Sequence, residues 1–394
     1  MMFVEAKWIY NYLLGKSETN EIDIFDICSN YKSLNRVTHY DKNDNLVESG
    51  ITHILSSVRQ ELMQQICNQI KGLAKLKEKG HKVGKLKFKS DFKSLKFKQY
   101  GVTHEIRGNK LKIQGLKTLI PLLGLKQLKS YTNIDFTTMH MIKVVDDYYV
   151  CFTCYVDKTN YKPKYQYNRK KRKYVGIDLG IANNLTLSNG EIIDCYVEET
   201  ERIKRLQRQI DRCANNSNNR YKLRLKLEKA YAKLTNKKNA LADQIVYKLL
   251  SENEIIVIQD DNLNEMKDNN AGSDRANVIQ HSILGRVKSR LKQYNNVIWL
   301  DRWFPTTQYC ECCGCKNKLK LTDRIYVCKN CGHTEERDFH AANNMLYFYS
   351  EYKRINNIDT SQELAGVPST IRFNSIKNEL SPSVKESTTS LAYY

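Results

Sequence analysis

Two pairs of cysteines have the spacing of a metal site. Cys310 and Cys313 form one pair, Cys328 and Cys331 the other, and fourteen residues separate the pairs. A glycine follows each pair directly, which is typical of a knuckle turn. Four thiolates at this spacing can surround Zn²⁺ tetrahedrally, and a site closed by four protein ligands is structural, not catalytic. Cys312 and Cys315 are extra thiols close to the first pair, so the set of four ligands could be shifted by a residue.

A second group of residues could do phosphodiester chemistry. Asp178 stands in the apolar stretch Val175–Leu179, with Gly176 and Gly180 two residues away on either side. The stretch suits a buried strand, and a buried carboxylate is costly unless it is paired or binds a metal. The glycines leave room for an anionic ligand or another backbone to approach. The alternative is an acid that caps a turn at the end of a strand.

Further acids could join Asp178. The stretch 254–261 is a second apolar strand that runs into Asp260 and Asp261, and Asp338 falls in the first turn of a helix that opens at Glu335. An acid in a first turn is also favoured by the helix dipole alone. If the acids cluster, they can bind Mg²⁺, and two such ions can activate a water and stabilise a leaving oxygen.

The charge balance predicts a polyanionic partner. The chain has 394 residues, 64 Lys and Arg against 43 Asp and Glu, and a net charge of +21. Such a chain usually meets nucleic acid, although a merely solvated basic surface is the alternative. We find no apolar run that could cross a membrane and no signal peptide, so lipid is a less suitable partner. We therefore expect a cytoplasmic protein without a membrane partner, associated with the nucleoid when bound to DNA.

The first part of the chain must supply a scaffold and a cationic surface. Helical spacing predicts helices over 3–14, ending at Gly15, and over 51–79. Strict alternation of Lys with Leu or Phe over 82–98 predicts a strand with one cationic face, which could follow a phosphate backbone. Short strands are also predicted at 103–107, 110–114, 139–145 and 148–156, which together suggest a small barrel or a curled sheet. The residues of the cationic strand expected to contact nucleic acid are Lys85, Lys87 and Lys89.

The second part must bring the acids together. A linker at 162–173 marks a domain boundary and carries a basic run that could contact nucleic acid. A basic helical hairpin over 197–250, turning at 215–219, leads into the strand 254–261 and then a polar loop over 262–277. A helix over 278–293 and a strand over 297–300 complete an α/β pattern. The basic run consists of Arg169, Lys170, Lys171 and Arg172.

Three motifs taken together resemble a known family. They are the sequence Gly-Ile-Asp-Leu-Gly at 176–180, the start of the cysteine region at 304–310, and Arg-Asp-Phe-His-Ala-Ala at 337–342. In this combination and order they resemble the TnpB (OrfB) proteins of bacterial insertion sequences, which share a RuvC-like nuclease with the compact type V CRISPR effectors. The resemblance covers roughly 81–348 and is strongest from 174 on.

The resemblance implies an architecture of the α/β class. It implies a RuvC-like, RNase H-like nuclease domain with an inserted zinc ribbon, preceded by a helical recognition domain and a barrel-like wedge domain. The expected segments are 1–80 for recognition, 81–165 for the wedge, 166–305 for the nuclease with its hairpin at 197–250, 306–334 for the ribbon and 335–350 for the final nuclease helix. The segment 351–394 lies outside the resemblance, and its polar, Ser/Thr-rich composition predicts a disordered tail.

The resemblance also implies a function. It implies an RNA-guided endonuclease that binds a guide RNA made from the transposon end and cuts double-stranded DNA beside a short adjacent motif, with structural Zn²⁺ and catalytic Mg²⁺. Asp178 and Asp338 match the first and last family acids. The family has Glu where this chain has Gln259, and we expect Asp260 to replace it, with Asp261 in reserve. We expect a monomer, or a weak dimer on the RNA.

Two other functions are consistent with the sequence. One is an RNA-guided DNA-binding repressor of the same family, inactive because of Gln259; the two intact acids argue against it. The other is a transposase in the strict sense, which ranks low because the chain has no His-x-His motif to support a tyrosine nucleophile.

Overall fold

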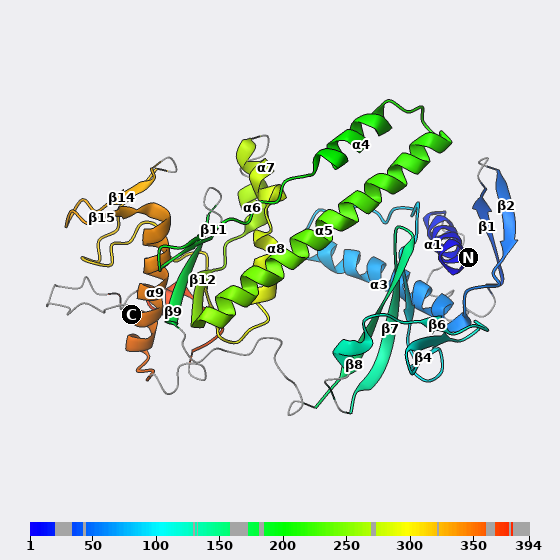
Figure 1. Ribbon diagram of the computed structural model, residues 1–394, viewed down its shortest axis with the longest axis horizontal. Coiled ribbons are helices and arrows are strands. Elements are labelled where there is room, and N and C mark those ends of the chain that lie inside the picture. The colour runs from blue at the N-terminus through cyan, green and yellow to red at the C-terminus, as the bar shows by residue number, and fades with distance from the viewer. Residues whose placement is uncertain are drawn as a thin grey trace. The chain divides into compact units, whose positions relative to one another are not determined.

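The chain divides into two compact units. They comprise Met1–Lys162 and Pro163–Tyr394 and are described separately (Figure 1). The boundary between the two units, at Lys162 and Pro163, lies at the start of the linker predicted over 162–173. The computed structural model describes residues 1–19, 34–41, 45–128, 131, 133–157, 172–180, 185–268, 273–320, 323–359, 367–377 and 380.

Two packed helices form the core of the first unit. The helix α3 has apolar residues at helical spacing, Val58, Leu62 and Ile66, and all three are buried against α1 residues such as Ile9 and Leu13. Three small sheets surround the helices, with strand orders β1-β2, β3-β7-β8 and β4-β5-β6. The elements are α1 (Met2–Glu18), β1 (Arg36–Tyr40), β2 (Leu46–Gly50), α3 (Ser56–Glu78), β3 (Ser94–Phe97), β4 (His104–Arg107), β5 (Lys110–Ile113), β6 (Ile120–Pro121), the 3₁₀ turn η1 (Leu125–Leu128), β7 (Asp135–Val144) and β8 (Asp147–Tyr155).

Two predictions for this unit need correction. The first helix does not end at Gly15 but continues to Glu18, since a single glycine inside a helix costs only about 1 kcal/mol. The cationic strand predicted over 82–98 is wrong except for β3. The Lys89 backbone N–H and C=O bond the Asn11 side chain, at 2.8 and 2.9 Å, instead of a neighbouring strand. The four later strands are confirmed as β4, β5, β7 and β8, but they belong to two separate sheets.

A mixed six-stranded sheet organises the second unit. Its order is β11-β10-β9-β12-β13-β16; β9, β12, β13 and β16 are parallel, and β10 is antiparallel to β9. The carboxyl ends of the parallel strands therefore meet at one edge. The strands of this sheet are β9 (Arg172–Leu179), β10 (Leu185–Leu187), β11 (Ile192–Ile193), β12 (Asn253–Gln259), β13 (Val297–Leu300) and β16 (Thr370–Ile371). A separate two-stranded sheet consists of β14 (Ile325–Val327) and β15 (Thr334–Glu336).

Helices cover both faces of this sheet. Residues Ile256 and Ile258 of β12 pack with α5 and α8, whereas Ile255 and Val257 pack with α9, so β12 is buried on both sides. The result is a three-layer α/β/α arrangement, and the predicted α/β class is confirmed. The helices are α4 (Glu201–Asp211), α5 (Asn218–Glu252), α6 (Leu263–Asp268), α7 (Asp274–His281), α8 (Leu284–Leu291), α9 (Arg337–Ile355) and the 3₁₀ turn η3 (Phe373–Ser375).

The predicted hairpin is present as α4 and α5. The polar loop predicted over 262–277 is wrong in part, because it contains α6 and the start of α7. The predicted single helix over 278–293 is also wrong, because the helix is interrupted at Ser282 and Ile283, between α7 and α8. There Ile283 N–H donates to the Cys195 carbonyl, at 2.8 Å, and Tyr196 forms a β-bridge with Ser282.

The predicted disorder from residue 351 on is also incorrect for part of that segment. The helix α9 continues to Ile355, and β16 pairs with β13 and buries Ile371. Residues 360–366, 378–379 and 381–394 lie outside the described residues.

None of the helices in the described part of the chain combines the length and the apolar content that crossing a bilayer requires.

Candidate active site and metal-binding cluster

A close approach between β9 and α9 sets the position of two acids. A Cβ added at Gly176 would lie 2.0 Å from the Ala342 carbonyl oxygen, so only glycine permits this contact. Asp178 is two residues further along β9 on the same face. Asp338 is one turn back along α9 from Ala342, on the same side of the helix. One backbone contact thus brings two acids, 160 residues apart in sequence, to the same edge of the sheet.

The Asp178 carboxylate lies in an acidic surrounding. Its pKa is raised well above the usual range, first by burial and then by the charges of Asp338 and Asp261, while Arg337 opposes the shift. Within the described part of the chain, no hydrogen bond or ion pair joins this carboxylate to another side chain. A carboxylate held among others without a partner is a candidate ligand for a cation.

Asp260 and Asp261 point to different surroundings. The backbone N–H of Asp260 donates to the Leu300 carbonyl, at 2.8 Å, so the ladder between β12 and β13 continues past Gln259. Side chains alternate along such a ladder. The Asp260 side chain therefore lies on the side of the sheet that α8 covers. The Asp261 side chain lies on the opposite side, which α9 covers and which Asp178 shares.

The Asp260 carboxylate is already paired. It contacts Lys288 Nζ at 2.7 Å and Lys292 Nζ at 3.1 Å. Burial raises the pKa of Asp260, but these two ammonium groups outweigh burial and lower it below its ordinary value. Burial raises the pKa of Asp261, with Lys288 opposing the shift. The geometry therefore favours Asp261 over the predicted Asp260 as the third acid near Asp178.

Gln259 has a structural set of contacts. Its amide nitrogen donates to the Phe304 carbonyl at 2.9 Å and to the Asp301 carbonyl at 3.2 Å, and its amide oxygen accepts from the Thr306 hydroxyl at 2.8 Å. A carboxylate could not make the two donor contacts. In this chain the glutamine ties the end of β12 to the loop that leads into the cysteine region.

Arg337 and Asp338 are neighbours in sequence and form an ion pair. Two guanidinium nitrogens of Arg337, Nε and Nη2, lie 3.2 and 3.1 Å from Asp338 Oδ1, and Nη1 donates to the Asp323 carbonyl at 2.8 Å. Asp338 is 4% exposed. Its orientation is therefore fixed by a side chain that is itself held by the loop before β14.

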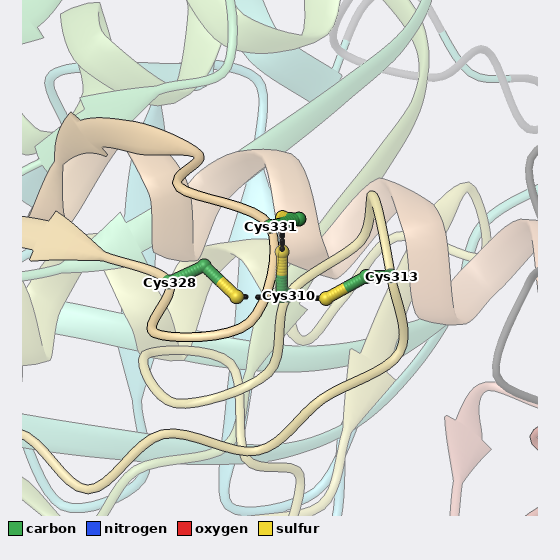
Figure 2. A group of neighbouring side chains, drawn as sticks. All are labelled: Cys310, Cys313, Cys328 and Cys331. Atoms are coloured by element: carbon green, nitrogen blue, oxygen red, sulfur yellow. Dashed lines mark hydrogen bonds between the residues drawn. The ribbon is translucent and has the colours of Figure 1, made fainter.

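The four predicted cysteines form a tight cluster that can bind zinc. Cys310 Sγ lies 3.6 Å from Cys331 Sγ, Cys313 Sγ lies 3.5 Å from Cys328 Sγ, and all four sulfur atoms are within 4.8 Å of one another (Figure 2). Tetrahedral Zn–S bonds of about 2.3 Å separate the sulfurs by about 3.8 Å, which agrees with these distances.

Two knuckle turns build the cluster. Gly314 N–H donates to the Cys310 carbonyl and Gly332 N–H to the Cys328 carbonyl, and both glycines have a positive φ, 73° and 74°. Burial raises the pKa of the Cys328 thiol, but the N–H groups of Cys331 and Asn330, with neighbouring side chains, lower it to about 5. A thiolate is the form that binds a metal.

The predicted nucleic-acid residues fall in both units of the chain. Lys85 and Lys87 are exposed in a segment of the first unit without regular structure. Lys89 Nζ lies over the rings of Tyr10 and Phe92, at 4.0 and 4.3 Å from their centres, and is therefore a packing residue. Arg172 is the first residue of β9, and 169–171 lie outside the described residues.

Some residues of the site were not singled out from the sequence. Gly176 was noted, but not its contact with α9; the pairing of Arg337 with Asp338 was not considered. Asp261 was named from the sequence only as a reserve for Asp260, although Gln259 and Asp261 are two residues apart and so share one face of a strand. The sequence did not show that the hydrogen bonds between β12 and β13 continue beyond Gln259 to Asp260, which is what sends Asp260 and Asp261 to opposite faces.

Two family models match consecutive parts of the chain. One, for the OrfB proteins of the IS605 type and described as "Probable transposase", matches residues 152–270. The other, described as "Cas12f1-like, TNB domain", matches residues 283–345. The first includes Asp178 and β12, and the second includes the cysteine cluster and Asp338. The class defined in this way is that of the transposon-encoded OrfB proteins and the Cas12f1-like proteins.

Curated relatives narrow the assignment. A "Putative RNA-guided DNA endonuclease" of Streptomyces pristinaespiralis is 32% identical over 181 residues, 44% of each chain. The "Putative RNA-guided DNA endonuclease InsQ" of Escherichia coli (strain K12) is 25% identical over 199 residues, 44% of this chain and 48% of the relative. The "TnpB-like protein L79" of Acanthamoeba polyphaga mimivirus is 27% identical over 209 residues, 47% of this chain and 38% of the relative.

The two family models and the curated relatives together support a TnpB-family protein. The chain spans less than half the length of the curated relatives it matches.

Proposed function

We propose that this chain is an RNA-guided DNA endonuclease whose active site consists of Asp178, Asp261 and Asp338. The observation that supports it most strongly is the close approach of β9 to α9 at Gly176, which brings Asp178 and Asp338 to one edge of the sheet. The raised pKa of Asp178, caused by burial and by the nearby carboxylates of Asp338 and Asp261, agrees with such a cluster. Like charges are gathered at such cost mainly where function requires them. The printed names of the relatives supply the reaction class.

The three acids suit Mg²⁺. Carboxylate oxygens are its preferred protein ligands, and Asp178, Asp261 and Asp338 would hold it at the carboxyl edge of the sheet. When bound, Mg²⁺ supplies an activated water and charge stabilisation at the leaving oxygen. Arg337 orients Asp338 for this role, and Asp260 keeps α8 attached to the end of β12 through Lys288. In this proposal the unit is a RuvC-like nuclease.

The hairpin of α4 and α5 is the surface we propose for nucleic acid in this unit. In α4, Ile203, Leu206 and Ile210 are buried, whereas Arg202, Arg205 and Arg208 are exposed. The exposed face of the hairpin is therefore cationic, and a row of such charges can neutralise successive phosphates. Further exposed lysines and arginines of the hairpin are Arg212, Lys222, Arg224, Lys226, Lys233 and Lys237.

The remaining assignments rest on the resemblance. The first unit would provide the recognition and wedge domains, with Lys85 and Lys87 as candidate contacts. A guide RNA would supply sequence by base pairing, and the protein would read a short motif beside the target. The cysteine cluster would hold a structural Zn²⁺ as a ribbon between β13 and α9, and the protein would act in the cytoplasm at the nucleoid.

Copurified RNA and a cleavage assay test this proposal. Full-length protein purified from its host should carry a discrete RNA, and target DNA chosen to match that RNA should be cut in Mg²⁺ but not in EDTA. Heterogeneous RNA that a mild salt wash removes would contradict the guide. Binding of the target without cutting, in Mg²⁺ or Mn²⁺, would replace the nuclease with a repressor.

A further inference from the structure

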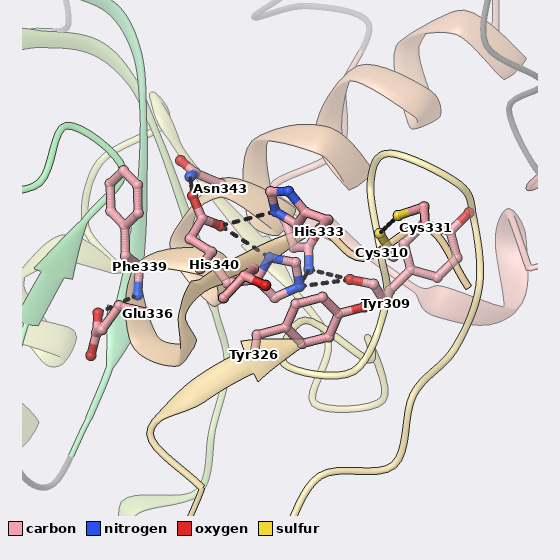
Figure 3. Close-up of polar contacts among 12 residues, drawn as sticks. Tyr309, Cys310, Tyr326, Cys331, His333, Glu336, Phe339, His340 and Asn343 are labelled. Atoms are coloured by element: carbon pink, nitrogen blue, oxygen red, sulfur yellow. Dashed lines mark hydrogen bonds and ion pairs between the residues drawn. The ribbon is translucent and has the colours of Figure 1, made fainter. Parts of the chain in front are cut away.

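A second group of metal ligands lies beside the cysteine cluster. His333 follows the second knuckle, Glu335 is in β15 and His340 is in the first turns of α9. One ligand atom from each of these three side chains lies within 4.8 Å of the others. Figure 3 shows His333 and His340 next to each other, with dashed lines from both rings to one carboxylate.

The hydrogen bonds of His340 determine which nitrogen is free. The Asn344 amide nitrogen lies 2.6 and 2.8 Å from the carbonyl oxygens of Thr306 and Tyr309 and 3.0 Å from His340 Nε2. Its two N–H groups are donated to the two carbonyls, so neither is left for His340 Nε2. His340 Nε2 is 2.8 Å from the same Tyr309 carbonyl. Since a carbonyl only accepts, Nε2 must carry the hydrogen, and a neutral ring then has its lone pair on Nδ1.

That lone pair faces another acceptor. His340 Nδ1 lies 3.1 Å from Glu335 Oε2, and His340 is fully buried. Two acceptors at this distance repel each other unless a proton or a metal ion lies between them. The contact therefore requires a cation of one kind or the other.

A third donor favours a metal over a proton. His333 Nε2 is 3.8 Å from the same Glu335 oxygen, too far for a hydrogen bond, and this buried nitrogen has no hydrogen-bond partner among the described residues. A proton between Glu335 and His340 would leave His333 Nε2 unsatisfied, whereas a metal ion would engage all three atoms.

The surroundings resemble the outer shell of a metal site. The second ring nitrogen of His340 donates to a backbone carbonyl, and Asn343 donates to Glu335 Oε1 at 3.1 Å. The Tyr326 ring stacks on His340 with centres 3.7 Å apart, which fixes the plane of the imidazole. Glu311 and Cys312 form a separate group with His333, in which one ligand atom from each residue lies within 4.8 Å of the others.

We propose that His333, Glu335 and His340 form a second transition-metal site, distinct from the four-cysteine cluster, that binds Zn²⁺. Two imidazoles and a carboxylate are a ligand set that zinc accepts. Such an ion would join the cysteine ribbon, through His333, to α9, through His340. Since Asp338 lies two residues before His340, the site would hold the acid helix in place independently of the RNA or DNA.

Metal content measured on the full chain tests the site without an activity assay. After loading with Zn²⁺ in an excess of Mg²⁺, which keeps the acid site filled, and removal of free metal, the wild type should hold two zinc ions per chain and Glu335→Gln one. Glu351→Gln, the same change on α9 at a residue paired with Arg354, should retain two. One ion in the wild type, or two in Glu335→Gln, would overturn the proposal and leave a protonated His340 paired with Glu335.

A milder variant keeps the test valid if Glu335→Gln unfolds the cysteine ribbon. Asn343→Ala removes only the hydrogen bond to Glu335 and should weaken the second ion by about 10- to 100-fold in competition with a chelator. The four-cysteine ion should be unaffected. An unchanged affinity for both ions would contradict the site. Neither result depends on nuclease activity, so the site and the proposed function can fail separately.

Discussion

Asp260 and Asp261 are neighbours in the chain, but their carboxylates have opposite electrostatic surroundings. Asp260 lies 2.7 Å from Lys288 Nζ and 3.1 Å from Lys292 Nζ, whereas the charge of Asp261 acts on Asp178. The ladder with β13 extends to Asp260, and alternation along it sends the two side chains to different faces. This difference decides which acid can complete a site with Asp178 and Asp338.

The acid cluster should cost stability when no metal is bound. The pKa of Asp178 is raised in the folded chain, so the folded state disfavours the ionised form, and stability should fall as pH rises above about 4 through the raised pKa. Asp178→Asn should therefore raise the unfolding midpoint in EDTA at pH 7 by about 2–4 °C for each kcal/mol recovered. Mg²⁺ should stabilise the wild type more than the variant.

Asp260→Asn provides a control with the opposite sign. In the wild type, Lys288 and Lys292 lower the pKa of Asp260, so the ionised carboxylate stabilises the fold above the ordinary pKa of 3.8. Removing the charge should lower the unfolding midpoint at pH 7. If both variants shift the midpoint in the same direction, the assignment of the two surroundings is incorrect.

The contact between β9 and α9 should tolerate no side chain at residue 176. Gly176→Ala places a Cβ 2.0 Å from the Ala342 carbonyl oxygen, and relief requires α9 to move. We expect a loss of about 1–3 kcal/mol or more in the free energy of unfolding. Gly72→Ala is the matched control: it lies in α3, a Cβ there meets nothing within 4 Å, and alanine should stabilise the helix by about 0.5–1 kcal/mol. Equal effects in denaturant unfolding would contradict the contact.

The four-cysteine cluster should hold one zinc ion. Cys328→Ser with Cys331→Ser should lose it and destabilise the segment from about 305 to 335, as measured by metal content and protease sensitivity. The control is Cys151→Ser with Cys154→Ser, a pair of the same spacing that is exposed on β8. Zinc retained at this site by the first double variant would rule out the assignment.

The first unit should depend on a buried acid. Glu5 is 1% exposed and accepts hydrogen bonds from the backbone N–H groups of Thr52, His53 and Ile54, just before α3 begins. Burial raises the pKa of Glu5, but the His53 side chain and these N–H groups outweigh it, so its folded pKa lies below 4.5.

Glu5→Gln therefore gives a pH-dependent loss. The stabilisation from the carboxylate is present above pH 4.5 and is lost as pH falls through the folded pKa. We expect the variant to be less stable by about 1–3 kcal/mol at pH 7, with the difference shrinking in acid. A difference that is constant with pH would show that charge is not the cause.

The sequence was most informative where chemistry and spacing coincide. The cysteine cluster follows from ligand spacing, and Asp338 in the first turn of α9 follows from the helix signal after the second knuckle. Predictions failed where a distant partner decides the local structure. The alternating segment 82–98 pairs with a neighbouring strand only at β3. The helix predicted over 278–293 is interrupted because Ile283 and Ser282 bond to Cys195 and Tyr196 instead. The two-residue strand β16 has no local pattern to detect.

Cleavage of guide-matched DNA by four single variants tests the central claim most directly. Asp178→Ala, Asp338→Ala and Asp261→Ala should each abolish Mg²⁺-dependent cutting, a loss of at least about 100-fold, while RNA and target binding remain close to wild type. Asp260→Ala should still cut, at a rate reduced only through its lower stability. Normal cutting by Asp261→Ala together with loss of cutting by Asp260→Ala would contradict the account and restore Asp260 as the third acid.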